Sequence, residues 1–280
     1  MHVVKIACER PDARGVSLST WFCADIAKQL VVDGVVTAIS PETVRRILQH
    51  HQLKPWRHHL WISPSHPRDA AFFDAVREVI DLYVRPLAAE ERVISLDEKT
   101  SMQPRPRQRP TRPAGPGNHP NLVEHEYTRV GALNLFAGVD TRSGHVYGQC
   151  HARKRQGEFL QFLELLDHEL PASIQRVHLV CDNVSIHRGK TVRQWLQTHP
   201  RFLCHFTPPY ASWINQIEQW FSILQRKRLR IVDFASPADL MAKLMAFIRL
   251  WNQDAHPFNW STKSVAKVMA KETRVLEHAA

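Results

Sequence analysis

The stretches ERVISLDEKT (residues 91–100) and QRVHLVCD (residues 175–182) share one pattern. Each is a short run of β-branched and other apolar residues that finishes on an acid. Runs of this length, bounded by polar residues, predict buried strands. We therefore expect two strands of one sheet, closed by Asp97 and Asp182. In open sheets, side chains at strand ends project into the crevice that carries functional residues.

The rest of the sequence around these two strands completes a mixed α/β pattern. Further short strands are predicted on both sides of them, and amphipathic helices alternate with the strands. This alternation is typical of a sheet covered by helices. The expected strands are 131–140, 145–151 and 201–207, and the expected helices are 157–170, 188–198, 211–230 and 236–253.

The segment between the first strand and residue 121 is rich in proline and arginine, MQPRPRQRPTRPAGPGNHP. Proline has no N–H for a ladder and breaks helix interiors, so this segment is neither a helix nor a central strand. We expect an extended, mobile and basic loop.

Composition narrows the class of protein. The chain has 280 residues, 37 Lys and Arg against 27 Asp and Glu, and a formal net charge of +10. Apolar residues make up 44%, which excludes general disorder, and no run reaches the ~18 apolar residues of a membrane span. The N-terminus does not have the pattern of a signal peptide, and the five scattered cysteines favour a reducing cytosol. The surplus positive charge makes nucleic acid the partner hypothesis.

Residues 17–51 predict two short helices separated by a turn. Ser19 or Thr20 can cap the first helix. Ser40 can cap the second, with Pro41 at the first helical position. Two short helices, the second of them basic, outline a helix-turn-helix. We therefore expect a small all-α, winged-helix-like domain before the α/β part.

Three acids form the candidate active site: Asp97, Asp182 and Glu218 of the segment PPYASWINQIEQWF. Convergent carboxylates supply hard oxygen ligands, which suit Mg²⁺ or Mn²⁺. Two such ions about 3.5–4 Å apart serve displacement reactions at phosphorus. Each acid also has a structural interpretation, because an Asp after a strand commonly forms a turn or caps a helix, and a helical Glu is usually solvated. Spacing alone does not decide between these interpretations.

Three blocks, ISLDEKT, LVCDNVSIH and TPPYASWINQIEQWFSIL, resemble the catalytic blocks of the DDE transposases of bacterial insertion sequences. More narrowly, they resemble the insertion-sequence 630 branch of the mariner-like superfamily. The tail WNQDAHPFNWSTK and the segment SPETVRRILQHHQLKPWR also resemble parts of that family. The likeness runs from about residue 17 to residue 270.

The resemblance implies an RNase H-like α/β fold, a mixed five-stranded sheet flanked by helices. It implies that Asp97, Asp182 and Glu218 are the catalytic residues and bind two Mg²⁺ ions, with Mn²⁺ as a substitute. The enzyme would hydrolyse DNA at the transposon end, and the freed 3′-hydroxyl would attack target DNA. A homodimer on double-stranded DNA, acting at terminal inverted repeats in the bacterial cytoplasm and nucleoid, is expected by analogy.

Further residues are candidates near this site or for DNA contact. Asn183 and His187 of DNVSIH can orient water or the DNA backbone, or can cap the next helix. Arginines of the second, basic helix of the helix-turn-helix can reach bases or phosphates. Arginines of the proline-rich loop form either a solvated charge run or a flexible basic strap over DNA. The residues expected near the active site are Glu98, Asn183, His187 and Asn215, and those expected to contact DNA are Arg45, Arg46, Gln49, Lys54, Arg57, Arg105, Arg107 and Arg109.

Relatives typically carry two N-terminal helix-turn-helix units, and this sequence begins at about the second. We expect a helix-turn-helix domain over 1–64, a linking helix over 65–90, a DDE catalytic domain over 91–260 and a tail over 261–280. The alternatives are a DNA-binding remnant that represses transposition without cutting, and a non-transposing nuclease of the same fold. The complete set of acids argues against the first, and the helix-turn-helix against the second.

Overall fold

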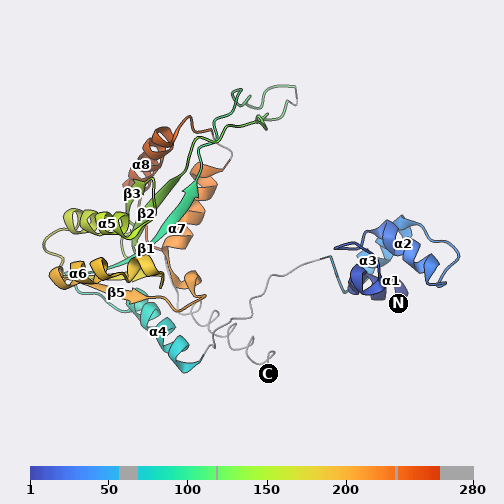
Figure 1. Cartoon of the computed structure of the whole chain (residues 1–280), viewed down its shortest axis with the longest axis horizontal. Coiled ribbons are helices and arrows are strands. Elements are labelled where there is room, and N and C mark those ends of the chain that lie inside the picture. Colours follow the sequence, from blue (N-terminus) through green and yellow to red (C-terminus); the bar gives the residue numbers. More distant parts are fainter. Residues whose placement is uncertain (57–68, 118, 231–232, 259–280) are drawn as a thin grey trace. The chain divides into compact units, whose positions relative to one another are not determined.

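The structure is a computed structural model and describes residues 1–56, 69–117, 119–230 and 233–258. The chain divides into two compact units, Met1–Ser63 and Pro64–Ala280 (Figure 1). Within the described residues, no helix has both the length and the apolar character needed to cross a bilayer.

The first unit is built from three helices, α1 (His2–Cys8), α2 (Cys23–Val32) and α3 (Pro41–His50). Their apolar faces form a core of their own. The predicted start of α3 is confirmed, because the Ser40 hydroxyl accepts a hydrogen bond from the Thr43 N–H at 3.1 Å. This bond satisfies one of the free N–H groups of the first turn.

Three features of this unit differ from the expectation. Helix α1 was not predicted, because its seven residues carry little periodic signal. Helix α2 begins after Phe22 without a side-chain cap, so the predicted start at Ser19 or Thr20 is wrong. The reason is that the indole N–H of Trp21 donates to the Glu9 carbonyl at 2.8 Å, which ties this stretch to the end of α1. No strand occurs among residues 1–56, so the described part of the unit shows no wing.

The second unit contains a five-stranded mixed sheet in the order β3-β2-β1-β4-β5. Strand β1 pairs antiparallel with β2 and parallel with β4, and β2–β3 and β4–β5 continue the two halves. All five predicted strands are present. Their bounds are β1 (Glu91–Met102), β2 (Leu133–Asp140), β3 (Val146–His151), β4 (Arg176–Cys181) and β5 (Phe202–Phe206).

Helices cover both faces of this sheet, because alternate residues of the central strands point to opposite sides. Ile94, Leu96 and Phe136 pack with α5 and α6 on one face. Leu135 and Ala137 pack with α7 and α8 on the other. Helix α4 packs through a third cluster that includes Val93 and Val180. The bounds are α4 (Ala70–Val84), α5 (Gln156–Glu169), α6 (Lys190–Thr198), α7 (Ile217–Leu224) and α8 (Pro237–Gln253), with short 3₁₀ turns η1 (Pro11–Arg14), η2 (Ser185–His187) and η3 (Ser212–Ile214).

The single long helix predicted over 211–230 is wrong. The segment forms the 3₁₀ turn η3, then α7, then a π-helical turn η4 (Gln225–Leu229). The break falls at Asn215, whose backbone is extended and whose buried side-chain amide donates to the Leu96 carbonyl at 3.0 Å. Side-chain bonding of this kind offers an alternative to helical hydrogen bonds.

The proline- and arginine-rich segment forms an extended arm, residues 103–117 and 119–132, which runs out from the end of β1 and returns to β2 (Figure 1). Isolated antiparallel bridges join its two sides, for example between Arg107 and Tyr127 and between Arg112 and Leu122. The predictions that this segment is extended and contains neither helix nor central strand are confirmed for the described residues.

Candidate active site

Asp97 lies within β1, not at its end as the sequence pattern suggested. The parallel ladder with β4 finishes at the Ser95–Val180 pair, whereas the antiparallel ladder with β2 continues through Asp97 to Met102. The longer partner β2 therefore extends β1 past the acid. On the side of β1 that faces β4, no strand lies beside Asp97, because the pairing with β4 has already ended. Asp182 directly follows the last residue of β4, as predicted.

Glu218 reaches the same region from a helix. It is in the first turn of α7, and its side chain is exposed. The helix is anchored beside β1 by the fully buried Trp220 and by Ile217, both in the core on this face of the sheet. Burial of the flanking apolar residues thus directs the carboxylate outward beside β1.

The electrostatics of Asp97 show that the three acids act on one another. Burial, together with the negative charges of Asp182, Glu98 and Glu218, raises the pKa of the Asp97 carboxyl to about 7, although a hydrogen bond from the Glu98 N–H opposes the change. That N–H lies 2.7 Å from Asp97 Oδ1. The site therefore concentrates negative charge that the protein itself does not fully compensate.

Strand alternation places Glu98 on the opposite face of the sheet from Asp97, and there it pairs with His187. The side chains of both residues are fully buried, and His187 Nε2 lies 2.7 Å from Glu98 Oε1. The other ring nitrogen, Nδ1, lies 2.9 Å from Asp182 Oδ1. Lys154 Nζ lies 3.2 Å from the second Glu98 oxygen. A buried imidazole thus connects Glu98 to one of the candidate catalytic acids.

The contacts of His187 lower the pKa of Asp182, whereas the pKa of Asp97 is raised. Burial alone would lower the pKa of His187, but the two carboxylates outweigh it and raise that pKa to about 10. Burial alone would raise the pKa of Asp182, but the hydrogen bond and charge of His187 lower it below its usual value. Asp182 is therefore held ionised, whereas the Asp97 carboxyl is the one that takes up a proton near neutral pH.

Asn215 fixes Asp97 from the other side. Its side chain is buried, and Nδ2 lies 3.0 Å from the Leu96 carbonyl and 3.4 Å from Asp97 Oδ2. Its oxygen accepts from the hydroxyl of Ser95, which in turn accepts from the Gln216 N–H at 2.9 Å. This buried network joins β1 to the segment that leads into the Glu218 helix.

Comparison with known proteins bears on this geometry. The sequence pattern of the DDE superfamily endonucleases matches residues 92–240, which is more than half of the chain and includes all three acids. The chain belongs to the DDE superfamily endonucleases. The matched residues include β4 and α7 and nearly all of β1, the elements that position the three acids.

One curated protein and one solved structure show how far the likeness extends. An insertion element IS630 uncharacterized 39 kDa protein from Shigella sonnei is 28% identical over 110 residues, which cover 38% of this chain and 31% of that protein. The alignment therefore spans about a third of the length of this curated relative. The solved Mos1 mariner paired end complex with Mn has a TM-score of 0.50 at 15% identity, over 83% of this chain and 79% of that chain. The latter likeness is one of fold, and it agrees with the RNase H-like sheet predicted above.

Of the other residues predicted near the site, Asn183 has a different setting. It is exposed, and its side-chain oxygen accepts from Arg188 rather than contacting an acid. Conversely, Lys154 and Ser95 contact the site residues but were not predicted. A lysine in a turn and a serine in a strand carry no distinctive signal, and only the fold brings them to Glu98 and Asn215.

The residues predicted to contact DNA on α3 are accessible but already bonded to one another. Arg45 and Arg46 are exposed and both pair with Glu42. Arg45 also donates to the side-chain oxygen of Gln49 at 2.9 Å, and Lys54 donates to the Gln49 carbonyl at 2.6 Å. Arg57 and the tail 261–280 lie outside the described residues.

On the arm, the three predicted arginines differ in their surroundings. Arg109 is exposed. The guanidinium of Arg105 lies 5.1 Å from the centre of the Tyr127 ring. Arg107 pairs with Asp233 at 2.5 Å, so it fastens the base of the arm to the segment before α8.

Because the pKa of Asp97 is raised, the ionised Asp97 carboxylate lowers the free energy of unfolding at neutral and alkaline pH. Its folded value is about 7, against about 3.9 in the unfolded chain. The folded state therefore binds the extra proton between these values, so the contribution of Asp97 to stability falls as the pH rises from about 4 to 7 and stays low above 7. We expect Asp97→Asn to be more stable than the parent chain in EDTA at pH 8, with a clearly smaller advantage at pH 5.

Urea unfolding at the two pH values measures this difference. Asp81→Asn, at an exposed position of α4, is the matched control and should change stability little at either pH. An equal advantage of Asp97→Asn at both pH values would show that burial and charge do not raise the pKa of this carboxyl.

Proposed function

We propose that the chain is a DNA transposase of the insertion-sequence 630 branch. It would cut DNA at the ends of its element and join the freed 3′-hydroxyl to target DNA. The observation that carries the proposal is the convergence of Asp97, Asp182 and Glu218 from β1, the end of β4 and α7, close enough that the other two charges raise the pKa of Asp97. Membership of the DDE superfamily endonucleases and the likeness to an insertion-element protein support it.

The donor set fits divalent cations. Carboxylate oxygens are the ligands that Mg²⁺ and Mn²⁺ prefer, and the uncompensated charge around Asp97 is what such ions would offset. Among the described residues, no group of three His, Cys, Asp or Glu side chains is already close enough to hold one metal ion. This is compatible with Mg²⁺, which takes one or two carboxylates and completes its shell with water and phosphate oxygens. Asp97, Asp182 and Glu218 would hold two Mg²⁺ between them, and Mn²⁺ would substitute.

When bound, these ions would activate the attacking oxygen and stabilise the leaving oxygen at phosphorus. The protein's own part is to keep the carboxylates in place. Asn215 bonds Asp97 to the backbone of β1, and the packing of α7 directs Glu218 outward. Both reaction steps, hydrolysis at the element end and attack by the 3′-hydroxyl, are in-line displacements that one such site can serve.

His187 is a positioning residue in this proposal. Through its contacts of 2.7 Å to Glu98 and 2.9 Å to Asp182, it fixes the orientation and the ionised state of the Asp182 carboxylate. Partners that orient a metal ligand in this way typically change metal affinity or activity 10–100-fold when removed.

The substrate is double-stranded DNA, including the terminal inverted repeats of the element. We assign DNA recognition to the helix-turn-helix domain over 1–64, in which α3 presents Arg45, Arg46 and Gln49, with Lys54 and Arg57 following it, and we assign strand contacts to Arg105, Arg107 and Arg109 of the arm. The catalytic domain would span 91–260 and follow the linking segment 65–90, which contains α4. Two copies, each holding one end, would form the working complex.

The first test is conversion of each acid to its amide. Asp97→Asn, Asp182→Asn and Glu218→Gln should each abolish Mg²⁺-dependent nicking of a duplex that carries the terminal repeat, because each removes a ligand charge while preserving shape. Binding of the duplex in a mobility-shift assay should remain within a few fold of the parent chain.

Glu164→Gln, at an exposed position of α5, is the matched control and should nick normally. If any of the three amide variants nicks DNA at the parental rate, that residue is not part of the active site. If the parent chain binds the duplex but never nicks it, the DNA-binding remnant becomes the better description.

The second test concerns His187. We expect His187→Ala to reduce the nicking rate at least about tenfold and to raise the Mg²⁺ concentration needed for half of the maximal rate, because Asp182 loses its orienting partner. His187→Gln, which keeps a hydrogen-bonding amide, should recover part of the loss. His168→Ala, at an exposed position of α5, should behave as the parent. A slower rate with an unchanged Mg²⁺ requirement would assign His187 to general stability instead.

A further inference from the structure

A chain of buried hydrogen bonds leads from helix α4 to Asp97. The hydroxyl of Tyr83, on α4, lies 3.1 Å from the hydroxyl of Ser95 on β1. Ser95 bonds to the side-chain oxygen of Asn215, and Asn215 Nδ2 lies 3.4 Å from Asp97 Oδ2. Tyr83, Ser95 and Asn215 are all buried, so their polar groups must find partners within the protein.

Only one orientation of the Asn215 amide fits these contacts. A backbone carbonyl can only accept, so the atom 3.0 Å from the Leu96 carbonyl is the amide nitrogen. The same NH₂ group faces Asp97, which leaves the amide oxygen to accept from Ser95. The single hydroxyl proton of Ser95 is therefore used on Asn215.

Tyr83 must then donate to Ser95. Because the Ser95 proton points to Asn215, the Ser95 oxygen can only accept from its other neighbours. It accepts from the Gln216 N–H at 2.9 Å and from the Tyr83 hydroxyl, which fills both acceptor positions of a hydroxyl oxygen. Burial raises the pKa of the Tyr83 hydroxyl, so this group keeps its proton. Three successive donors, Tyr83, Ser95 and Asn215, thus point toward the Asp97 carboxyl.

The ring of Tyr83 packs beside the residues on which its hydroxyl acts. It belongs to the apolar cluster that joins α4 to β1 through Val93 and to η3 through Ile214. Ser95 follows Val93 by two residues on β1, and Asn215 directly follows Ile214. One side chain of α4 therefore contacts both segments that carry the network.

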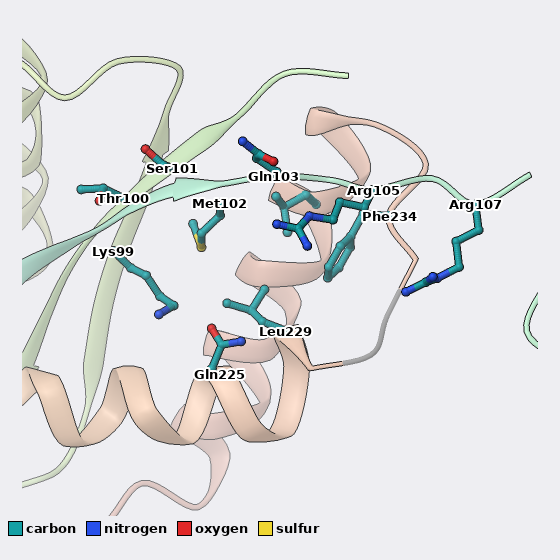
Figure 2. A pocket seen from close by; sticks show the side chains of 11 residues that line it. Lys99, Thr100, Ser101, Met102, Gln103, Arg105, Arg107, Gln225, Leu229 and Phe234 are labelled. Carbon is teal, nitrogen blue, oxygen red and sulfur yellow. The ribbon is translucent and has the colours of Figure 1, made fainter. Parts of the chain in front are cut away.

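On the other side of Asp97, β1 is less regular. The register of its pairing with β2 shifts after Lys99, and Ser101 in this bulge has a left-handed backbone with φ of 54°. A pocket of about 300 Å³ separates this part of β1 from the turn after α7, with Lys99 and Gln225 on opposite sides of it (Figure 2). Ser95, by contrast, is paired with both β2 and β4. The network thus supports Asp97 from the regular part of the strand.

We propose that Tyr83 is a positioning residue of the active site, whose hydroxyl acts through Ser95 to hold the Asn215 amide in the orientation that fixes the Asp97 carboxyl. This role rests on the proposed DNA-cleaving function and adds to it a residue from the linking segment 65–90. Tyr83 does not contact Asp97 directly. Its loss should therefore weaken the site without abolishing cleavage.

The first measurement needs neither metal nor DNA. The full chain is labelled with ¹⁵N in its asparagine side chains, and Asn215→Ala identifies the Asn215 amide signal by its loss. Tyr83→Phe keeps the ring and removes the hydroxyl. We expect it to shift the Asn215 signal and to speed exchange of these amide protons severalfold, because Ser95 loses a donor and the bonds of the chain reinforce one another. Tyr147→Phe, at another buried tyrosine, is the matched control and should leave the signal unchanged.

The second measurement is the Mg²⁺ concentration that gives half of the maximal nicking rate on a terminal-repeat duplex. We expect Tyr83→Phe to raise it roughly threefold, less than the 10–100-fold typical of a direct partner of a metal ligand, and to change the rate at saturating Mg²⁺ little. Ser95→Ala should raise it further. In the Ser95→Ala background, Tyr83→Phe should add nothing, because both residues act on Asn215 along one path. Circular dichroism of each variant confirms that the fold is retained.

The inference is overturned if Tyr83→Phe leaves either the Asn215 signal or the Mg²⁺ requirement unchanged, or if Ser95→Ala does not move that signal. It is also overturned if the effects of Tyr83→Phe and Ser95→Ala multiply in the double variant, as independent contributions would. A parent chain that binds the duplex but never nicks it contradicts the proposed function instead. The Asn215 signal of the metal-free chain then still decides whether Tyr83 controls the network.

Discussion

Repulsion among carboxylates is the constraint around which the catalytic unit is arranged. Asp97, Glu98, Asp182 and Glu218 gather where the parallel half of the sheet ends, and burial together with the other charges raises the pKa of Asp97 to about 7. The surrounding residues offset part of this charge in distinct ways. His187 lies between Glu98 and Asp182, Lys154 contacts Glu98, and Asn215 donates to Asp97. What they leave uncompensated is the charge that the proposed divalent cations would offset.

The acids can gather at this point because the pairing of β1 with β2 is longer than its pairing with β4. Strand β1 continues along β2 after its parallel partner β4 has ended, so that one side of Asp97 is open while its backbone remains paired. The same extension of β1 carries the chain through the bulge at Ser101 into the arm. Asp97, the bulge at Ser101 and the arm are therefore consecutive features of one strand, and α7 packs beside that strand.

Much of this was accessible from the sequence, and the exceptions have physical causes. Five strands were predicted because their apolar runs are short and bounded by turns, and Asp182 closes its strand as expected. Asp97 does not close β1, because only the pairing with β2, which is distant in sequence, extends that strand. The helix over 211–230 breaks at Asn215 because a tertiary hydrogen bond to Leu96 outweighs helical periodicity. Residues of the three motif blocks were found through their resemblance to a family, whereas Lys154 and the bulge at Ser101 depend on contacts that no local pattern encodes.

The central claim is that the carboxylates form a divalent-cation site for DNA cleavage. Anomalous diffraction from Mn²⁺ in crystals of the full chain bound to terminal-repeat DNA tests it most directly. The account predicts Mn²⁺ peaks in contact with Asp97 and bounded by Asp182 and Glu218, beside the phosphate of the bond to be cut. Full Mn²⁺ occupancy elsewhere on the protein–DNA complex, with no peak against these three acids, would contradict it.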